Sequence, residues 1–488
     1  MKSKIKNLFS LLLEVSEEVP DGIFFIYRGT PVSYRDSLLI SQKFASYLLK
    51  RGIKKNDRVL LFIGNVPEFI YSYFAIAQIG AIAVLINPIA KRYELKYYIE
   101  ETTPKIIITK KKELDNFKEN DSSFYSLSNI ILIDELSNSN GFWNQIEHEK
   151  PKKGYEELEP DHASAIIYTS AMDGFPLGAM LTHNSIFTAA VGTSKLWIEE
   201  GDVFLSVLPL FHAFGLTATL IIPLYGRLPF YLMDKFSPKG VLELITKGNC
   251  NTFCGVPIMY NLLSRIISQG TKFPWMRSWI SGGEALPLAL QRDMNNRFNI
   301  EIREGYGLTE ASPNVTWNYF GIPNKFGSIG LPLPYNRVKI IKNEREAESN
   351  EDGEIVIKGS NVIPCYFNRD DKTMEIIKDG WLYTGDIGRF DDDGYFYITG
   401  MKKDMVINNG FNVYPKEIER ILRYHPSISD VHITINREKN GKNIPSMETI
   451  EATIYRKDGH TLDQESLLDW CKENISFYKI PQNIHMHV

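Results

Sequence analysis

Short apolar runs alternate with amphipathic stretches through the first third of the chain. The apolar runs, which predict buried strands, span residues 58–64, 81–87, 105–109 and 130–133. The stretches between the first three runs, at 65–80 and 94–104, read as helices, the first with a plausible start at Asn65, Pro67 and Glu68. Strands that alternate with helices in this way predict βαβ units and a mainly parallel sheet. Apolar residues at helical spacing also predict a helix near the N-terminus.

The pattern changes to short alternating segments between residues 335 and 400. The Asp352–Gly353 pair between RVKIIK and EIVIKG predicts a tight turn joining antiparallel strands, and a second hairpin is predicted around Asp393–Gly394. From about residue 404, the order strand, loop, helix, two strands and helix predicts a small α+β unit. A chain of 488 residues is therefore expected to hold two or more cooperating units.

Composition and charge exclude several classes of protein. Hydrophobic residues make up 43% and charged residues 23%, which is ordinary for a globular protein with a large core. The net charge is -4, and the sequence contains no basic stripe interleaved with aromatic residues, so nothing in its charge favours binding to nucleic acid. The four cysteines form no CxxC pair and no zinc-ligand spacing, which favours a reducing compartment. Because no apolar stretch of about 20 residues exists to span a bilayer, we expect a cytoplasmic protein.

The most informative segment is YTSAMDGFPLGAMLTH, at 168–183, which follows an apolar strand and directly precedes a predicted helix. Thr169 and Ser170 supply hydroxyl donors, and Gly174 and Gly178 let backbone N–H groups approach an anion. The pattern favours phosphate binding. It is not specific, because many strand–helix loops contain glycine and serine and no Walker-type GxxxxGK[ST] is present.

Six further motifs follow this loop in a fixed order. They are LPLFHAFGLT at 208–217, SGGEALP at 281–287, GYGLTE at 305–310, DGEIVIKGSNVIPCYFN at 352–368, WLYTGDIG at 381–388 and GMKKDMVINNGFNVYPKEIE at 400–419. In this order they resemble the adenylate-forming (AMP-binding) superfamily of acyl- and aryl-CoA synthetases, luciferases and peptide-synthetase adenylation domains. The resemblance runs from VSYRD at 32–36 to FYKIP at 477–481, and is to the acyl-CoA synthetase, or long-chain fatty-acid–CoA ligase, type.

The resemblance implies both a fold and a reaction. The expected fold is α/β, with a large N-terminal domain at 1–400 of αβ-layered subdomains plus a distorted β-barrel. A hinge at 401–403 would join it to a small mobile α+β C-terminal domain at 404–488. The resemblance also implies ATP, Mg²⁺ and coenzyme A, with acyl-AMP formed first and acyl-CoA second.

Site residues are carried over from the matching motifs, although each alone has a simpler structural explanation. The expected nucleotide-binding residues are Thr169, Ser170, Gly174, Gly178, Gly283, Glu284, Gly305, Tyr306 and Asp386. Tyr306 is expected to stack on adenine, and Asp386 to accept hydrogen bonds from the ribose hydroxyls. Glu310, beside Thr309, is expected to bind Mg²⁺, because a hard cation prefers oxygen ligands.

The remaining expected residues concern the acid and the thioester step. The expected catalytic residues are Thr309, Glu310, His212 and Lys403, and Gly410 is expected to let backbone pass close to the pantetheine arm of CoA. His212 would stand at the mouth of the acyl pocket and Lys403 at the hinge. Amino-acid-activating relatives carry an Asp after the aromatic residue of LPLFHAFG. Because His212 and Ala213 stand there instead, a plain fatty or other apolar acid is favoured.

Three departures from the family pattern lower the positive charge around a bound triphosphate. The phosphate loop has Asp173 and Leu177 where the family has Thr and Lys, and Met401 replaces the usual Arg. The sequence ends at Val488, before the segment that carries the family's C-terminal Lys. Each charge-assisted contact is worth about 1.5–3 kcal/mol, so we expect the adenylation step to be slowed.

Three functional hypotheses follow. The first is an ATP-dependent carboxylic acid–CoA ligase. The second is a catalytically impaired or half-active relative that binds AMP, acyl-AMP or acyl-CoA. The third is an acyl-AMP ligase that loads a separate acyl carrier protein, since no carrier domain is fused to this sequence. Choice of acid, CoA against carrier protein, and oligomeric state are left open.

Overall fold

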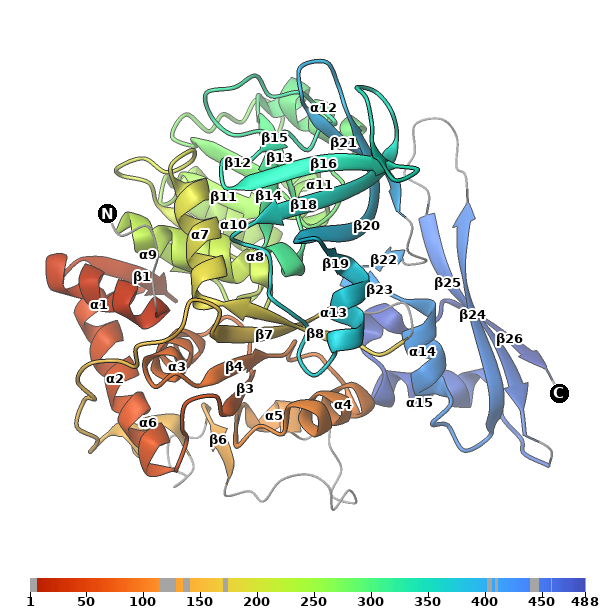
Figure 1. The fold of residues 1–488 in the computed structure, drawn as a ribbon, viewed down its shortest axis with the longest axis horizontal. Coiled ribbons are helices and arrows are strands. Elements are labelled where there is room, and N and C mark those ends of the chain that lie inside the picture. Colours follow the sequence, from red (N-terminus) through yellow and green to blue (C-terminus); the bar gives the residue numbers. More distant parts are fainter. Residues whose placement is uncertain are drawn as a thin grey trace.

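A computed structural model describes residues 7–114, 129–134, 141–169, 174–401, 406–408, 411–438, 447–457 and 459–487. Figure 1 shows two large sheets with their helices, a curled antiparallel sheet beside them, and a small C-terminal unit on one side. No helix in the described parts of the chain combines the length and hydropathy needed to cross a bilayer.

The first large sheet is mainly parallel. In spatial order its strands are β6 (Ile130–Leu132), β5 (Ile106–Thr109), β3 (Arg58–Phe62), β4 (Ile82–Leu85), β7 (Ala163–Thr169) and β8 (Leu177–Thr182). Only the pairing of β7 with β8 is antiparallel. Strands β3, β4 and β5 are almost entirely buried. This explains their continuous apolar runs, because a parallel sheet is covered on both faces.

The second large sheet positions the candidate site. In spatial order its strands are β15 (Leu331–Pro332), β14 (Asn314–Trp317), β13 (Ile302–Gly307), β12 (Ser278–Ser281), β11 (Thr252–Gly255), β9 (Phe204–Ser206), β10 (Phe230–Leu232), β1 (Ile23–Tyr27) and β2 (Thr30–Ser33). The strands from β13 to β1 pair in parallel. The carboxyl ends of β11, β12 and β13 therefore meet at one edge, where α/β proteins commonly bind ligands.

Several helices of these two layers begin where the sequence supplies a cap or a first-turn proline. They are α1 (Leu8–Glu18), α2 (Tyr34–Lys50), α3 (Pro67–Gln78), α4 (Arg92–Thr102), α5 (Lys111–Leu114), α6 (Phe142–Ile146), α7 (His183–Ser194), α8 (Ala213–Leu216), η2 (Thr217–Ile221), α9 (Ile222–Gly226), α10 (Pro238–Thr246), α11 (Pro257–Ile266) and α12 (Leu288–Phe298). Asn7 caps α1 by accepting the Phe9 N–H, and Ser33 caps α2. Pro67 stands at the start of α3, where its missing N–H costs nothing.

The curled sheet is antiparallel throughout. It contains β16 (Asn336–Lys342), β17 (Arg345–Glu346), β18 (Gly353–Gly359), β19 (Ile377–Lys378), β20 (Trp381–Phe390) and β21 (Phe396–Met401). Of two short helices, α13 (Asp370–Ile376) lies directly before β19, and η3 (Thr309–Ala311) lies between β13 and β14 of the second sheet.

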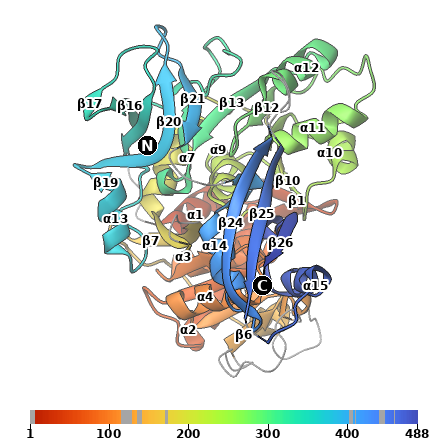
Figure 2. The same cartoon turned by 90° about the vertical axis from the view of Figure 1, so that its right-hand side faces the viewer.

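The C-terminal unit has a hydrophobic cluster of its own. It contains β22 (Val406–Asn408), β23 (Phe411–Val413), α14 (Pro415–Leu422), β24 (Ile428–Glu438), β25 (Met447–Arg456), α15 (Gln464–Asn474), η4 (Phe477–Lys479) and β26 (Asn483–His487). Ile418, Val431 and Leu467 are fully buried in this cluster, and Ile89 and Tyr93 of the larger part pack against it. Figure 2 shows the unit lying across one face of the molecule, beside α4.

Structure and sequence expectation differ at several places. The helix predicted after the 168–183 segment is confirmed as α7, but the segment before it is not all loop, because Leu177–Thr182 forms β8 and pairs with β7. The turn predicted at Asp352–Gly353 lies instead at Asn343 and Glu344, which have φ angles of 47° and 65°. Gly353 begins β18. The last strand, β26, was not predicted, and it pairs in parallel with β25. The hairpin predicted at Asp393–Gly394 is confirmed by the pairing of β20 with β21.

Candidate functional site

A cleft of about 520 Å³ lies between the second sheet, the curled sheet and the C-terminal unit. Its walls come from segments that are far apart in sequence: residues 208–215, 283–285 and 304–310, strand β20, and Tyr414, Tyr478 and Lys479 of the C-terminal unit. Residues from several of the motifs thus line one concave surface.

Glu310 stands in η3, directly after the carboxyl end of β13, and is 7% exposed. The Tyr366 hydroxyl donates to Glu310 Oε1 at 2.6 Å, and the Thr169 hydroxyl donates to the same oxygen at 3.2 Å. Burial and the neighbouring Glu310 carboxylate raise the pKa of Tyr366, so this tyrosine remains a neutral donor. The two donors fix the orientation of a carboxylate that lines the cleft.

Glu310 fits the Mg²⁺ ion that the motifs imply. Mg²⁺ in nucleotide sites is usually held by one or two carboxylates together with phosphate oxygens and water. The described residues contain no cluster of three or more His, Cys, Asp or Glu side chains that would form a metal site without the nucleotide. One buried, oriented carboxylate beside a nucleotide-sized space is the donor set that such shared binding requires.

Tyr306 and Asp386 form a hydrogen-bonded pair that also lines the cleft. The Tyr306 hydroxyl donates to Asp386 Oδ2 at 2.6 Å, and the Thr384 hydroxyl oxygen accepts the Asp386 N–H at 3.0 Å. Burial, with a further contribution from Asp386, raises the pKa of Tyr306. Because both partners are held, the Asp386 carboxylate and the Tyr306 ring present fixed surfaces to a ligand.

His212 stands where the cleft meets a second, inner cavity. Its Nδ1 accepts the Phe214 N–H at 3.3 Å at the start of α8. The imidazole is exposed to the cleft, and desolvation by the protein atoms around the cleft lowers its pKa. A neutral ring whose Nδ1 accepts a hydrogen bond carries its proton on Nε2, which makes Nε2 a donor.

Two more carboxyl groups line the cleft, and both are shielded from water. Burial raises the pKa of Glu304 to about 8, although its Oε1 accepts the Leu286 N–H at 2.8 Å. Burial also raises the pKa of Glu284. Gly283 has a φ of +84°, in the left-handed region that favours glycine, which lets the loop turn at the cleft edge. With a pKa of about 8, the Glu304 carboxyl group is therefore mainly protonated near neutral pH.

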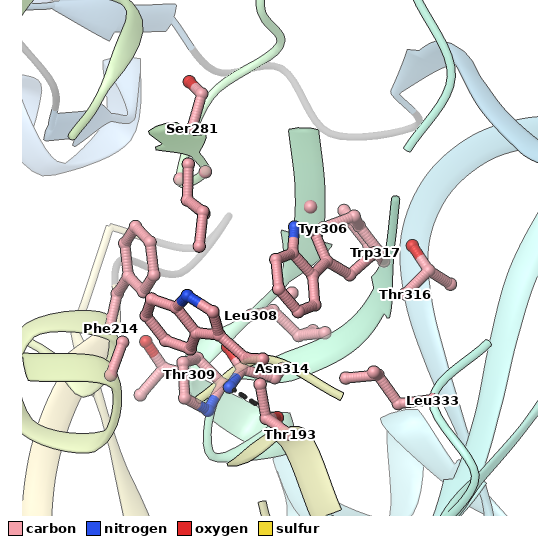
Figure 3. Close-up of a pocket in the computed structure, with 18 of the residues that line it drawn as sticks. Thr193, Phe214, Ser281, Tyr306, Leu308, Thr309, Asn314, Thr316, Trp317 and Leu333 are labelled. Carbon is pink, nitrogen blue, oxygen red and sulfur yellow. Dashed lines mark hydrogen bonds between the residues drawn. The ribbon is translucent and has the colours of Figure 1, made fainter. Parts of the chain in front are cut away.

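The inner cavity has a volume of about 60 Å³ and continues from the cleft behind residues 305–309. Figure 3 shows Phe214, Leu308, Trp317 and Leu333 around it, with Thr193 and Asn314 joined by a hydrogen bond at one side. The walls are therefore mainly aromatic and aliphatic, with a few polar groups.

The structure brings most of the expected site residues together. Those that line the cleft are Thr169, His212, Gly283, Glu284, Gly305, Tyr306, Thr309, Glu310 and Asp386. Gly174 and Gly178 do not line it. A Cβ on Gly174 would lie 2.6 Å from the Lys416 carbonyl oxygen, and one on Gly178 would lie 2.9 Å from Ile166. Both glycines thus permit close packing. Ser170, Asp173, Lys403 and Gly410 lie outside the described residues.

Sequence reasoning missed several residues that the geometry makes prominent. Tyr366 orients Glu310 from 56 positions away, so no local spacing reveals the contact. Lys479 lines the cleft from η4 and forms ion pairs with Glu94 and Glu417. A signal for Lys479 existed, because FYKIP was among the matching segments, but its buried partners Glu94 and Glu417 lie far from it in sequence.

Comparisons with known proteins agree with this arrangement. A sequence model described as AMP-binding enzyme matches residues 12–367. The long-chain-fatty-acid–CoA ligase of Bacillus subtilis is 31% identical, over 98% of this chain and 90% of that protein. Among solved structures, a double mutant of o-succinylbenzoate CoA synthetase from Bacillus subtilis, bound with its product analogue, superimposes with a TM-score of 0.83. It is 26% identical and covers 98% of this chain and 94% of its own.

The same synthetase in complex with its acyl-adenylate intermediate superimposes with a TM-score of 0.70, at the same identity and coverage. The fold expectation is confirmed: mixed α/β, with large layered N-terminal sheets, a curled sheet and a small C-terminal α+β unit. The family match covers most of the sequence, and the relatives extend over nearly all of it. The chain belongs to the AMP-binding enzyme family and, within it, to the acid–CoA ligases.

Proposed function

We propose that this protein is an ATP-dependent carboxylic acid–CoA ligase acting on an acid with a mainly apolar tail. In the first step a carboxylate oxygen attacks the α-phosphorus of ATP, and the bond to the bridging oxygen breaks to release pyrophosphate. In the second step the CoA thiol loses its proton and its sulfur attacks the acyl carbon of acyl-AMP. A C–S bond forms, the C–O bond breaks and AMP leaves.

One observation carries this proposal. The cleft places Glu310 and the Tyr306–Asp386 pair in the same space, directly in front of a mainly apolar cavity. A nucleotide and an acid bound there would have their reacting groups next to each other, which removes much of the entropic barrier to a reaction between them.

The proposed roles follow from position and chemistry. Asp386 accepts hydrogen bonds from the ribose hydroxyls, and the Tyr306 ring lies against the adenine. Ser170 and Thr309 offer hydroxyl donors to the phosphates, Thr169 lies beside them while its hydroxyl donates to Glu310, and Gly174 and Gly178 shape the loop. His212 offers its Nε2–H to the acid carboxylate or to the adenylate formed from it. The hinge role of Lys403 and the role of Gly410 beside the pantetheine arm remain predictions.

Mg²⁺ held by Glu310 would neutralise charge on the phosphate oxygens during the transfer. The protein's own part is to hold that carboxylate still through Tyr366 and Thr169. Preorganised groups of this kind stabilise the transition state because they need not rearrange during the reaction.

Pyrophosphate release with a panel of carboxylic acids, followed by detection of CoA thioesters, tests the proposal. Release with at least one acid, together with its thioester, supports a complete ligase. Thioester formation from supplied acyl-AMP and CoA, without pyrophosphate release from any acid, supports the half-active alternative. If neither pyrophosphate release nor thioester formation is detected with any acid, both the complete-ligase and the half-active hypotheses are overturned.

One observation supports the half-active alternative. Among the described residues that line the cleft, Lys479 is the only lysine or arginine, and its ammonium is paired with Glu94 and Glu417. Leu177, which stands where the family has a lysine, is 7% exposed and packs in the main hydrophobic cluster. The described lining therefore offers little positive charge to a triphosphate.

Replacing Leu177 with lysine is expected to raise the rate of pyrophosphate release by about 10- to 100-fold. Leu177 is paired with Thr169 in the β7–β8 hairpin, so the two side chains lie on the same face of the sheet. The lysine stem would occupy the space of the leucine while its ammonium reached towards Thr169 and the phosphates. Lysine at Met180, on the opposite face of β8, is the matched control. An equal response of both variants would contradict the charge argument.

A further inference from the structure

The inner cavity is small for an acyl-binding space. Its volume is about 60 Å³, while the cleft in front of it has about 520 Å³. An engineered protein cavity that binds benzene measures roughly 150 Å³. A long alkyl chain therefore has no room behind residues 305–309 unless a wall moves.

Two tryptophans form the wall that limits this cavity. Trp197 and Trp317 are each 4% exposed, and their ring centroids lie 5.6 Å apart with an angle of 67° between the planes. Trp197 follows α7, and its indole N–H donates to the Ser278 hydroxyl at 3.2 Å. Trp317 stands on β14 and lies across Gly305, where an added Cβ would come within 3.1 Å of its ring. Both rings are thus held from more than one side.

The neighbouring part of the wall is held by hydrogen bonds. Asn314 donates to the Thr193 hydroxyl at 3.1 Å, as Figure 3 shows, and the Tyr335 hydroxyl lies 3.0 Å from the same oxygen. The Tyr335 ring packs so closely on Gly192 that an added Cβ there would lie 2.0 Å from it. A wall fixed by this network resists the displacement that a longer tail would need.

We infer that the substrate is a compact carboxylic acid rather than a long-chain fatty acid, and that Trp197 and Trp317 set its length limit. This inference rests on the proposed ligase function and narrows its substrate class. Of the two kinds of acid that the sequence favours, fatty or other apolar, the cavity accepts the shorter and more compact.

Substitution of Trp317 is expected to change the maximum length of acyl tail that the cavity accepts. Behind it lies Phe320, whose ring centroid is 5.7 Å away and which is partly exposed. Removing the Trp317 side chain therefore extends the cavity towards Phe320 and the surface. Removing the Trp197 side chain extends it towards Phe204, which is fully within the core, at a centroid distance of 5.0 Å. The cavity opened by removing the Trp317 side chain should therefore admit a longer acyl tail than the one opened by removing the Trp197 side chain.

The test uses the intact chain and straight-chain acids from butanoate to hexadecanoate, with CoA thioester formation as the readout. We expect an optimum at octanoate or shorter, with kcat/KM falling roughly tenfold or more per methylene beyond it. In Trp317→Ala the optimum should move to a longer acid, and kcat/KM for dodecanoate should rise roughly 100-fold. Trp197→Ala should give a smaller shift in the same direction.

Trp275→Ala is the matched control, because Trp275 is 41% exposed and lies away from the cavity. Its length profile should equal that of the wild type. Thermal unfolding identifies a variant that fails to fold, in which case Trp317→Leu takes its place. The wild-type profile tests the length limit without any variant. Calorimetric titration of the wild type with nonreactive acyl-adenylate analogues of graded length tests the same limit without turnover.

The outcomes separate the two proposals. If no acid gives an adenylate or a thioester and no analogue binds, the ligase function itself fails. If hexadecanoate reacts or binds as well as octanoate in the wild type, or if neither tryptophan variant lengthens the profile, the compact-acid inference is overturned while the ligase function stands.

Discussion

Replacing Glu310 with glutamine is expected to lower the rate of acid-dependent pyrophosphate release by about 100- to 1,000-fold. Glutamine keeps the size of the side chain and one oxygen for the Tyr366 and Thr169 hydroxyls. It removes the negative charge that would bind Mg²⁺ beside the phosphates. The measurement is pyrophosphate release at saturating ATP, with Mg²⁺ varied.

The control for this variant is Glu301→Gln, directly before β13, where the carboxylate is 51% exposed and pairs with Arg303. Arg303 keeps its hydrogen bonds to the Asn318, Tyr319 and Ile322 carbonyls in this variant, so its pyrophosphate release should match the wild type. The Glu310 variant should also require a higher Mg²⁺ concentration. Wild-type rates in the Glu310 variant at all Mg²⁺ concentrations would show that this carboxylate has no part in the reaction.

The second large effect concerns the contact between the C-terminal unit and the larger part. The Lys479 ammonium contacts Glu94 of α4 and Glu417 of α14, the latter at 2.7 Å, and all three side chains are nearly inaccessible to water. The Ser476 N–H also donates to Glu94, at 3.2 Å. Nearby, the Tyr93 and Tyr424 rings stack with centroids 4.5 Å apart. A buried ion cluster therefore joins the two parts.

Lys479→Met should weaken this docking strongly, because it leaves the Glu94 and Glu417 carboxylates buried without a cation. Removing one partner of a buried pair costs about 3–5 kcal/mol. We expect faster amide hydrogen exchange in α4 and the preceding loop, and a lower rate of thioester formation from supplied acyl-AMP. Hydrogen exchange followed by mass spectrometry measures the first effect.

Lys472→Met is the matched control, because Lys472 lies on the same unit, is 67% exposed and pairs with Asp469 at the surface. Its exchange pattern should equal that of the wild type. An identical pattern in the Lys479 variant would show that the ion cluster does not hold the unit in place.

The pH dependence of this docking follows from the pKa shifts. Burial alone would raise the pKa of Glu94, but the Lys479 ammonium outweighs it and the pKa is lowered. Burial alone would lower the pKa of Lys479, but Glu417 and Glu94 raise it well above the usual value. The contribution of Glu94 is complete above its ordinary value of 4.5 and is lost as the pH falls through its depressed pKa. That of Lys479 is complete below 10.5 and is lost as the pH rises through its raised pKa.

The sequence predicted the parallel strands well because their physical signal is local. The runs in β3, β4 and β5 are continuous and apolar, as burial on both faces requires. Strand β8 was missed because Gly174 and Pro176 precede it and Gly178 lies within it, so the segment reads as loop followed by helix. The turn at Asn343 and Glu344 was missed because neither residue is glycine, although both adopt positive φ.

The candidate site could be predicted only in part, because some of its contacts join residues that are far apart in sequence. Glu310, Tyr306 and Asp386 were found through the order of motifs, which requires no knowledge of their contacts. The contact of Tyr366 with Glu310 and that of Lys479 with Glu94 join residues 56 and 385 positions apart. No periodicity encodes such pairs, because they exist only once the layers have packed. The two tryptophans of the inner cavity were missed for the same reason.

Calorimetric titration of the intact chain with AMP tests most directly whether this cleft is a nucleotide site. The account predicts binding with a Kd below about 1 mM. In Asp386→Asn, loss of charge-assisted hydrogen bonds to the ribose should weaken the binding roughly tenfold or more. Absence of any heat of binding at millimolar AMP, or equal affinity in the wild type and Asp386→Asn, would contradict it.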